Sequence, residues 1–397
     1  MNLYNDASLI ITPNGVKAGK LYALKGDDLN VVRATSATRV NASGLIELVG
    51  ANVLRLDYTN GSCPSILVEQ QRTNITLQSQ DLSSTWYTAG GLLDSNITTS
   101  PDGTNTADKI KADNTNSIHV YQQTINVLNA TEYTMSVFVK SSEYTFFELA
   151  DASNLKAQTF NLTSKTISAP QTGGFTPATS SKIEDYGNGW LRCSITYTTS
   201  STTAFFRISL SNGTTTSFAG NNTNGLFVWG AQLEAGSYAT SYIPTTSASV
   251  TRNADVISKT GISSLIGQTE GTMFFDLNLN SRISYNYIFL LTNFSKYISI
   301  FITNNTIRLE IVNSSTQVSI DFSNTNNGRF KIGVGYANNN VIYYVNGTLI
   351  GSDNSCTIPD TNQIDLTYNS ANSIEYKTVA LWKTRLTNSQ IAELTTI

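Results

Sequence analysis

The chain contains one histidine, and that residue limits the chemistry that the sequence can support. A Ser/His/Asp triad would have to use His119, yet no Gly-x-Ser-x-Gly elbow accompanies it. His119 lies in the strand-like run 117–121, where a hydrogen-bonded structural histidine is the ordinary outcome. The three cysteines are odd in number and widely spaced, so they fit neither a zinc site nor a disulfide framework, and we expect them to be reduced and buried.

Paired carboxylates are the remaining route to catalysis, because a glycosidase needs an acid and a base or nucleophile across a cleft. The sequence offers Glu148 with Asp151, and Glu184 with Asp185. Among 28 acidic residues such neighbours arise by chance, and adjacent residues of a strand point to opposite faces. We therefore expect a protein that is not an enzyme.

Aromatic side chains are the more informative set, since sugar rings stack on Trp and Tyr while their hydroxyls bond to polar groups. Trp190 and Trp229 lie in or at the start of alternating segments and are expected in the core. Other aromatic residues stand beside loops, where exposure and contact with a glycan are expected. These candidates are Trp86, Tyr87, Tyr144, Tyr285 and Tyr287.

Calcium is the one metal ion that such a sequence could hold, through carboxylate and carbonyl oxygens in loops. The loop at Asp102 and the hinge at Asp255 offer these ligands. An ordinary turn is the favoured interpretation of both segments. We expect no required cofactor, and structural calcium stays an open alternative.

The elements that position these residues are expected to be strands. Charged residues make up only 13% of the 397 residues, against about 25% in an average soluble protein. Asn, Ser, Thr and Gly replace them, with 19 Tyr and 16 Phe as apolar bulk. Helix surfaces are built mainly from Glu, Lys, Arg and Ala, whereas Thr and aromatic residues suit sheets. The composition therefore predicts an all-β protein.

Charge and hydropathy exclude two classes of partner. The net charge of −3 and the absence of a basic stripe argue against nucleic acid. The longest apolar runs, such as 298–302, are strand-sized, which argues against membrane insertion.

Three stretches of the chain differ in their pattern. Residues 1–77 are loop-rich and basic, and we interpret them as an attachment segment that contacts a partner or the next domain. A chain that lacks this segment is expected to fold but not to assemble.

Residues 78–253 alternate apolar and polar side chains with a period of two, as in 133–140 and 191–197, which predicts an antiparallel jelly roll. Residues 254–397 repeat this pattern and predict a second antiparallel sandwich, of concanavalin-like type. Within it, Asn346-Gly347 predicts a hairpin turn. Thr387 and Gln390 predict a capping box at the start of a short terminal helix.

The N-terminal stretch resembles the opening of a family of bacteriophage structural proteins, notably from phages of Bacteroidota. The matching segments are 33–47, 55–58 and 61–69. The middle stretch is similar to carbohydrate-binding jelly rolls of the same proteins, and the last stretch resembles concanavalin-like, laminin-G-type sandwiches. The matching segments of the middle stretch are 101–104, 185–190, 229–234 and 241–244. Those of the last stretch are 344–347 and 379–394.

These resemblances imply a virion structural protein of tail-fibre or head-fibre type. Such a protein is made in the host cytoplasm, acts extracellularly, binds other virion proteins through its N-terminal segment, and attaches to host surface glycan. Phage fibres by analogy imply a homotrimer. Two alternatives remain open: a purely structural decoration or assembly protein of the virion, and a glycan-degrading virion enzyme.

Overall fold

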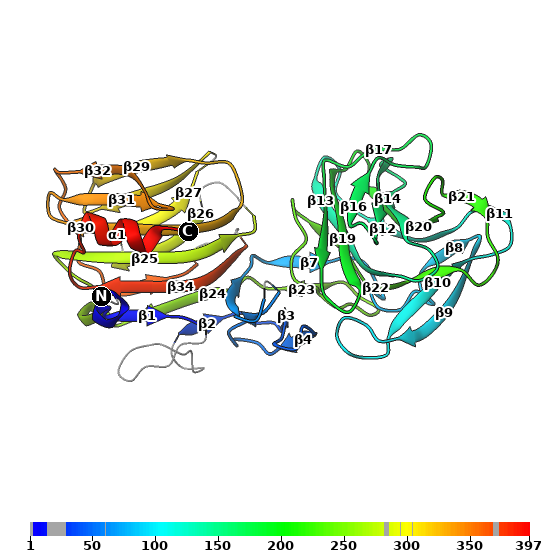
Figure 1. Cartoon of the computed structure of the whole chain (residues 1–397), viewed down its shortest axis with the longest axis horizontal. Helices are drawn as coiled ribbons and strands as arrows, with labels where there is room; N and C mark the ends of the chain where they lie inside the picture. Colours follow the sequence, from blue (N-terminus) through cyan, green and yellow to red (C-terminus); the bar gives the residue numbers. More distant parts are fainter. Residues whose placement is uncertain are drawn as a thin grey trace. The chain divides into compact units, whose positions relative to one another are not determined.

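The computed structural model describes residues 3–13, 29–59, 61–281, 286–293, 295–303, 305–367 and 373–397. Sheets dominate it, and all but one of the described strand pairings are antiparallel (Figure 1). The predicted all-β class with two antiparallel sandwiches is confirmed. None of the helices among the described residues is long and apolar enough to cross a membrane.

The chain divides into two compact units, which alternate along the sequence. We call residues 1–42, 49–71 and 253–397 the split domain, and residues 43–48 and 72–252 the inserted domain. The split domain is therefore built from segments on both sides of the inserted domain. The sequence predicted a separate attachment segment over residues 1–77, whereas most of these residues belong to the same unit as residues 253–397.

The split domain contains two packed sheets. One has the order β32 (Thr348–Asp353), β31 (Val341–Val345), β30 (Gly328–Ala337), β25 (Glu270–Leu279), β34 (Ile374–Trp382), β6 (Ser65–Val68), β5 (Leu56–Asp57), with β1 (Leu9–Ile11) also paired to β34. The other has the order β2 (Asn30–Val32), β24 (Val256–Thr260), β33 (Gln363–Asp365), β26 (Asn286–Asn293), β27 (Lys296–Ile302), β28 (Thr306–Val312), β29 (Thr316–Ser323).

Three short helices and two short strands lie outside these two sheets. They are η1 (Leu3–Asp6), η2 (Ser263–Leu265), α1 (Asn388–Thr395), β3 (Ala37–Val40) and β4 (Ile46–Val49). Helix α1 begins with the predicted capping box, in which Thr387 and Gln390 bond reciprocally, so that prediction is confirmed. Ile391 of α1 packs on Ile342 and Tyr344 of β31.

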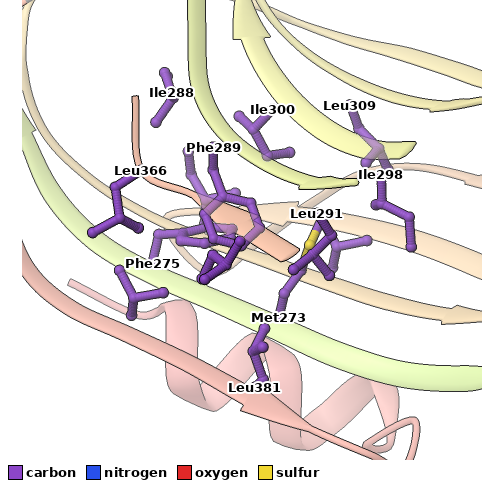
Figure 2. Packing of buried hydrophobic residues seen from close by; sticks show 14 of the residues in the cluster. Met273, Phe275, Ile288, Phe289, Leu291, Ile298, Ile300, Leu309, Leu366 and Leu381 are labelled. Atoms are coloured by element: carbon purple, nitrogen blue, oxygen red, sulfur yellow. The ribbon is translucent and has the colours of Figure 1, made fainter. Parts of the chain in front are cut away.

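The core of the split domain lies between its two sheets. Figure 2 shows Met273 and Phe275 of β25 packed among aliphatic side chains of the facing sheet, including Ile298 and Ile300. Leu9 and Val68 belong to the same core and are fully buried. The N-terminal strands therefore supply core residues to the last sandwich, because β1 and β6 pair with β34 at the far end of the chain.

The inserted domain is a sandwich of two further sheets. One has the order β18 (Ser180–Asp185), β19 (Trp190–Thr198), β13 (Glu132–Ser141), β22 (Gly225–Ala235), β10 (Ala107–Ala112), β9 (Gly91–Thr98). The other has the order β16 (Thr166–Ser168), β15 (Lys156–Asn161), β14 (Phe146–Asp151), β20 (Thr203–Ser211), β12 (Val120–Asn126), β8 (Tyr87–Ala89), with β17 (Thr176–Pro177) paired to β15. Two small ladders pair β7 (Arg72–Asn74) with β23 (Val250–Arg252), and β11 (Asn116–Ile118) with β21 (Ser217–Ala219).

Candidate functional site

The two sheets of the inserted domain differ in what covers their outer faces. On the β19–β13–β22 sheet, Phe138 points away from the core and is completely buried. Its ring contacts Trp229 and Tyr242, with ring centres 5.4 and 6.0 Å apart. Arg192 lies over the same ring and donates to the Thr240 carbonyl at 2.6 Å. The segment around Tyr242 therefore closes this face.

The segments that carry the carbohydrate-binding resemblance thus have a structural role here. Trp190 and Trp229 are 2% and 1% exposed, as predicted for core residues. Trp190 donates its indole N–H to the Thr99 carbonyl at 3.1 Å, and Trp229 donates to Thr106 Oγ1 at 3.1 Å. These indoles hold loops against the sheet and offer no surface to a ligand.

The outer face of the other sheet carries a polar row. Strand register places Tyr87 of β8 opposite Gln122 of β12, and Gln122 opposite Arg207 of β20. Directly opposed residues share one face, with Cβ atoms about 4.5–5.5 Å apart. Phe206 and Ile208, which flank Arg207, belong to the core, so Arg207 points outward. We call Tyr87, Gln122 and Arg207 the donor row.

The donor row has hydrogen-bonding capacity left over. Arg207 Nε donates to Gln122 Oε1 at 2.9 Å. Gln122 Nε2 and the two terminal nitrogens of Arg207 donate to no other described residue, and none of the three is a buried atom. Partial burial lowers the pKa of Arg207, and the charge of Glu148 offsets this only in part. The row therefore presents unused N–H donors beside Tyr87, which is 65% exposed.

Glu148 anchors the loop that follows β16 on the same outer face. Glu148 of β14 is completely buried and pairs in register with Ser209, two residues from Arg207 along β20. Its Oε2 accepts from the backbone N–H groups of Gln171 and Thr172 at 2.6 and 3.2 Å. Its Oε1 has no hydrogen-bond partner among the described residues. Glu148 thus fixes the loop after β16 and leaves one carboxylate oxygen unpaired.

The predicted glycan contacts of this domain have different positions. Tyr87 is exposed, as expected. The prediction for Trp86 is wrong: its ring is 8% exposed and packs edge-on against Phe206 in the core, because neighbouring strand residues alternate between faces. Tyr144 is half-buried and contacts Phe218 with ring centres 5.4 Å apart, outside the donor row.

In the split domain, Tyr287 belongs to a partly exposed aromatic patch on β26 and β27. Its ring centre lies 5.6 Å from that of Phe301 and 6.3 Å from that of Tyr297. The Tyr297 hydroxyl donates to Glu310 at 2.7 Å. Tyr285 lies outside the described residues.

The two carboxylates proposed for calcium already have protein partners. Asp102 Oδ1 accepts from Ser100 Oγ at 2.5 Å and from the Thr104 backbone N–H at 3.0 Å, as in an ordinary turn. Asp255 is buried against two arginines, with Arg33 Nη1 at 2.7 Å and an ion pair to Arg55. Both carboxylate oxygens of Asp255 are therefore paired with arginine in this arrangement. No group of three or more His, Cys, Asp or Glu side chains in the described ranges is placed to hold a metal ion.

The residues considered for catalysis are held in structural contacts. His119 is completely buried, and its Nε2 lies 2.9 Å from the Phe218 carbonyl. Asp151 accepts from the backbone N–H of Phe205 at 2.9 Å and from neighbouring amides, whereas Glu148 binds the loop on the outer face. Glu184 and Asp185 form surface ion pairs with Lys182 and Lys165, each at 2.7 Å.

Sequence reasoning missed Gln122 and Arg207. The alternation of apolar and polar residues in the sequence of β12 and β20 identifies which residues point outward. It does not reveal that these two strands are neighbours, since the register joins residues 85 positions apart. Tyr87 was found because it stands beside a loop.

Comparisons with known proteins give distant likenesses. No protein-family model matches the sequence, and no curated protein matches it. The chain is similar to the botulinum neurotoxin serotype C1 binding domain at 20% identity and a TM-score of 0.30, over 36% of this chain and 40% of that one. It thus spans about two fifths of that binding-domain chain.

Two further structures show a similar degree of likeness. The carbohydrate-binding module CBM40 of the Ruminococcus gnavus IT-sialidase, bound to α2,3-sialyllactose, matches at 12% identity and a TM-score of 0.30, over 34% of this chain and 86% of that one. Domains LG4–5 of the mouse laminin α1 chain match at 11% identity and a TM-score of 0.23, over 76% of this chain and 91% of that one. Scores this low do not establish a common ligand or activity.

Proposed function

We propose that this protein is a glycan-binding protein without enzymatic activity, and that its inserted domain contacts saccharide through the donor row. The observation that carries the proposal is the exposed ring of Tyr87 beside unpaired donors of Gln122 and Arg207 on a rigid sheet. Tyrosine rings stack on sugar rings, and side-chain donors orient the ring oxygens and hydroxyls. Strands hold such groups in place, so little entropy is lost on binding.

The expected affinity of one site is low. A single stacked ring with a few hydrogen bonds buries little area, so we expect a Kd near millimolar, which corresponds to about −4 kcal/mol. Display of several copies raises overall affinity by roughly 10²- to 10⁴-fold. A weak site is therefore compatible with firm attachment of an assembly.

A finer proposal concerns the biological setting. The resemblance of residues 33–69 to bacteriophage structural proteins supports a virion component that is made in the host cytoplasm and acts outside the cell. In this proposal the split domain, which includes residues 33–42 and 49–69, contacts other virion proteins, and copies assemble as a trimer. The runner-up remains a purely structural virion protein, and the third alternative is a glycan-degrading enzyme.

The test displays the full chain multivalently on beads and measures binding to host cells and to their purified surface polysaccharide. Tyr87→Ala is expected to reduce binding at least about tenfold, since tenfold corresponds to about 1.4 kcal/mol of lost contact. Leu128→Ala is the control, because Leu128 is equally exposed at 67% but lies outside the donor row. Both substitutions should leave the melting temperature unchanged.

Two results would contradict the proposal. If the multivalent display binds neither cells nor polysaccharide, the structural alternative takes its place. If oligosaccharide is released at a steady rate during incubation, the protein is an enzyme.

A further inference from the structure

We infer that the donor row recognises the carboxylate of an acidic saccharide, such as a uronic or sialic acid residue, and this inference rests on the proposed glycan binding. The argument depends on which hydrogen-bonding groups remain unused. Gln122 has one acceptor atom, Oε1, and Arg207 Nε donates to one of its two lone pairs. What remains on these two side chains is three N–H-bearing nitrogens against a single lone pair of Gln122 Oε1, so donors outnumber acceptors.

A surface with more donors than acceptors discriminates between ligands. A sugar hydroxyl both donates and accepts, so a neutral sugar uses such a surface incompletely. A carboxylate only accepts, and its two oxygens match the two terminal nitrogens of a guanidinium in a bidentate pair. The Gln122 amide is positioned by its bond to Arg207 and can donate to the same anion. The chemistry of the row therefore favours a carboxylate over a neutral ring.

The charge balance on this face supports the same ligand. Arg207 is half-buried and forms no ion pair within 4.0 Å among the described residues, although the charge of Glu148 acts on it. Glu148 itself is completely buried beneath Gln171 and Thr172, so it cannot move to the guanidinium without releasing that loop. A cation that has lost part of its hydration without gaining a hydrogen-bonded anion is stabilised by an anionic ligand.

Tyr87 is the reason why we expect a saccharide and not a free carboxylate at this site. A free carboxylate such as acetate would satisfy Arg207 and Gln122 but would leave the exposed ring of Tyr87 uncovered. Tyr87 and Arg207 flank Gln122 on adjacent strands, so their Cβ atoms lie roughly 10 Å apart, about the length of one pyranose ring with its substituents. A ring that stacks on Tyr87 can thus place its carboxylate over Gln122 and Arg207.

The experiment uses an array of acidic glycans, both polyuronates and sialylated oligosaccharides, each printed beside its carboxyl-reduced counterpart. The full-length protein is applied at several salt concentrations. The acidic form is expected to bind at least about tenfold more tightly than the reduced form for one or more pairs. The difference should shrink as salt rises, because a partly exposed charge pair is screened.

Two substitutions remove the preference in different ways. Arg207→Gln removes the charge, and Gln122→Glu keeps the shape while replacing the free donor by a negative charge. Both should abolish the preference for the acidic form. Arg308→Gln is the matched control, since Arg308 is a half-buried arginine on a strand of the split domain. It should leave the preference unchanged.

The outcomes separate the two proposals. If acidic and reduced glycans bind equally and Tyr87→Ala abolishes both, glycan binding stands and the carboxylate inference is wrong. If a preference for acidic glycans persists in Arg207→Gln, the inference is also wrong, because another cation is responsible. If no glycan binds at all, the proposed function fails, and the inference fails with it.

Discussion

Substitution of Asp255 by alanine should destabilise the split domain strongly. Asp255 joins Arg33 and Arg55, and Arg55 also pairs with Glu69 at 2.8 Å. The side chains of these four residues are at most 4% exposed. These four side chains contribute two positive and two negative charges. Removal of Asp255 takes away the negative partner of two buried ion pairs, those with Arg33 and Arg55.

The magnitude follows from the burial of this cluster. Loss of one partner of a buried ion pair costs about 3–5 kcal/mol. The Glu69 backbone N–H, which donates to Asp255 at 2.9 Å, also loses its acceptor, so the upper half of that range is expected. For a domain of about 200 residues, this corresponds to a fall in melting temperature of roughly 8–20 °C.

Calorimetry of the full chain with Asp255→Ala and with Asp321→Asn measures this difference. Asp321 pairs with Arg308 on the surface, where its side chain is 37% exposed. A surface pair of this kind contributes about 0–1 kcal/mol, so the control should melt almost like the parent protein. The reasoning is refuted if Asp255→Ala melts at the parental temperature. It is also refuted if a calcium chelator alone lowers the parental melting temperature by the same amount, since Asp255 would then be a calcium ligand.

Three further outcomes are expected. Gly347→Val should cost about 1–3 kcal/mol in the free energy of unfolding, measured in urea, because the residue has a φ of +80°. Hydrogen bonds from Lys109 and from the Gly225 backbone outweigh burial and lower the pKa of Glu143 to about 2. Its stabilising effect is therefore complete above its ordinary pKa of 4.5 and is lost as the pH falls towards 2, so the stability difference between parent and Glu143→Gln should shrink over that range. A chain without residues 1–13 should fail to fold its split domain, as judged by hydrogen exchange, since it lacks β1.

The sequence was sufficient for local features. Asn346 and Gly347 have φ values of +51° and +80°, as the predicted hairpin turn requires, and the capping box at Thr387 is formed. Each of these features is decided by residues within four positions of one another. The burial of Cys193 and Cys356 was also predicted, whereas Cys63 is exposed.

Features set by distant strand pairing could not be predicted. β1 pairs with β34, where Leu9 lies opposite Leu381, and no local pattern encodes that partnership. Residues 1–77 were interpreted as an attachment segment because the strand that completes their sheet, β34, lies at the far end of the chain. Because β1 and β6 complete the sheet of β34, we now expect that a chain without these residues does not fold its split domain. The donor row could not be predicted for the same reason, since Gln122 and Arg207 are neighbours only through the register of β12 and β20.

The alternation of the two domains along the chain has a consequence for synthesis. The split domain needs β34 to pair β1 and β6, so the ribosome must first deliver all of residues 72–252. At about 5–20 residues per second, β1 waits roughly 10–40 s for this segment alone. The inserted domain, whose long segment is continuous and closed by the pairing of Arg72 with Arg252, can complete its own sheets within that interval. During translation the apolar residues Leu9, Ile11 and Val68 stay without their partners, and a chaperone that shields nascent strands would be needed most at this stage.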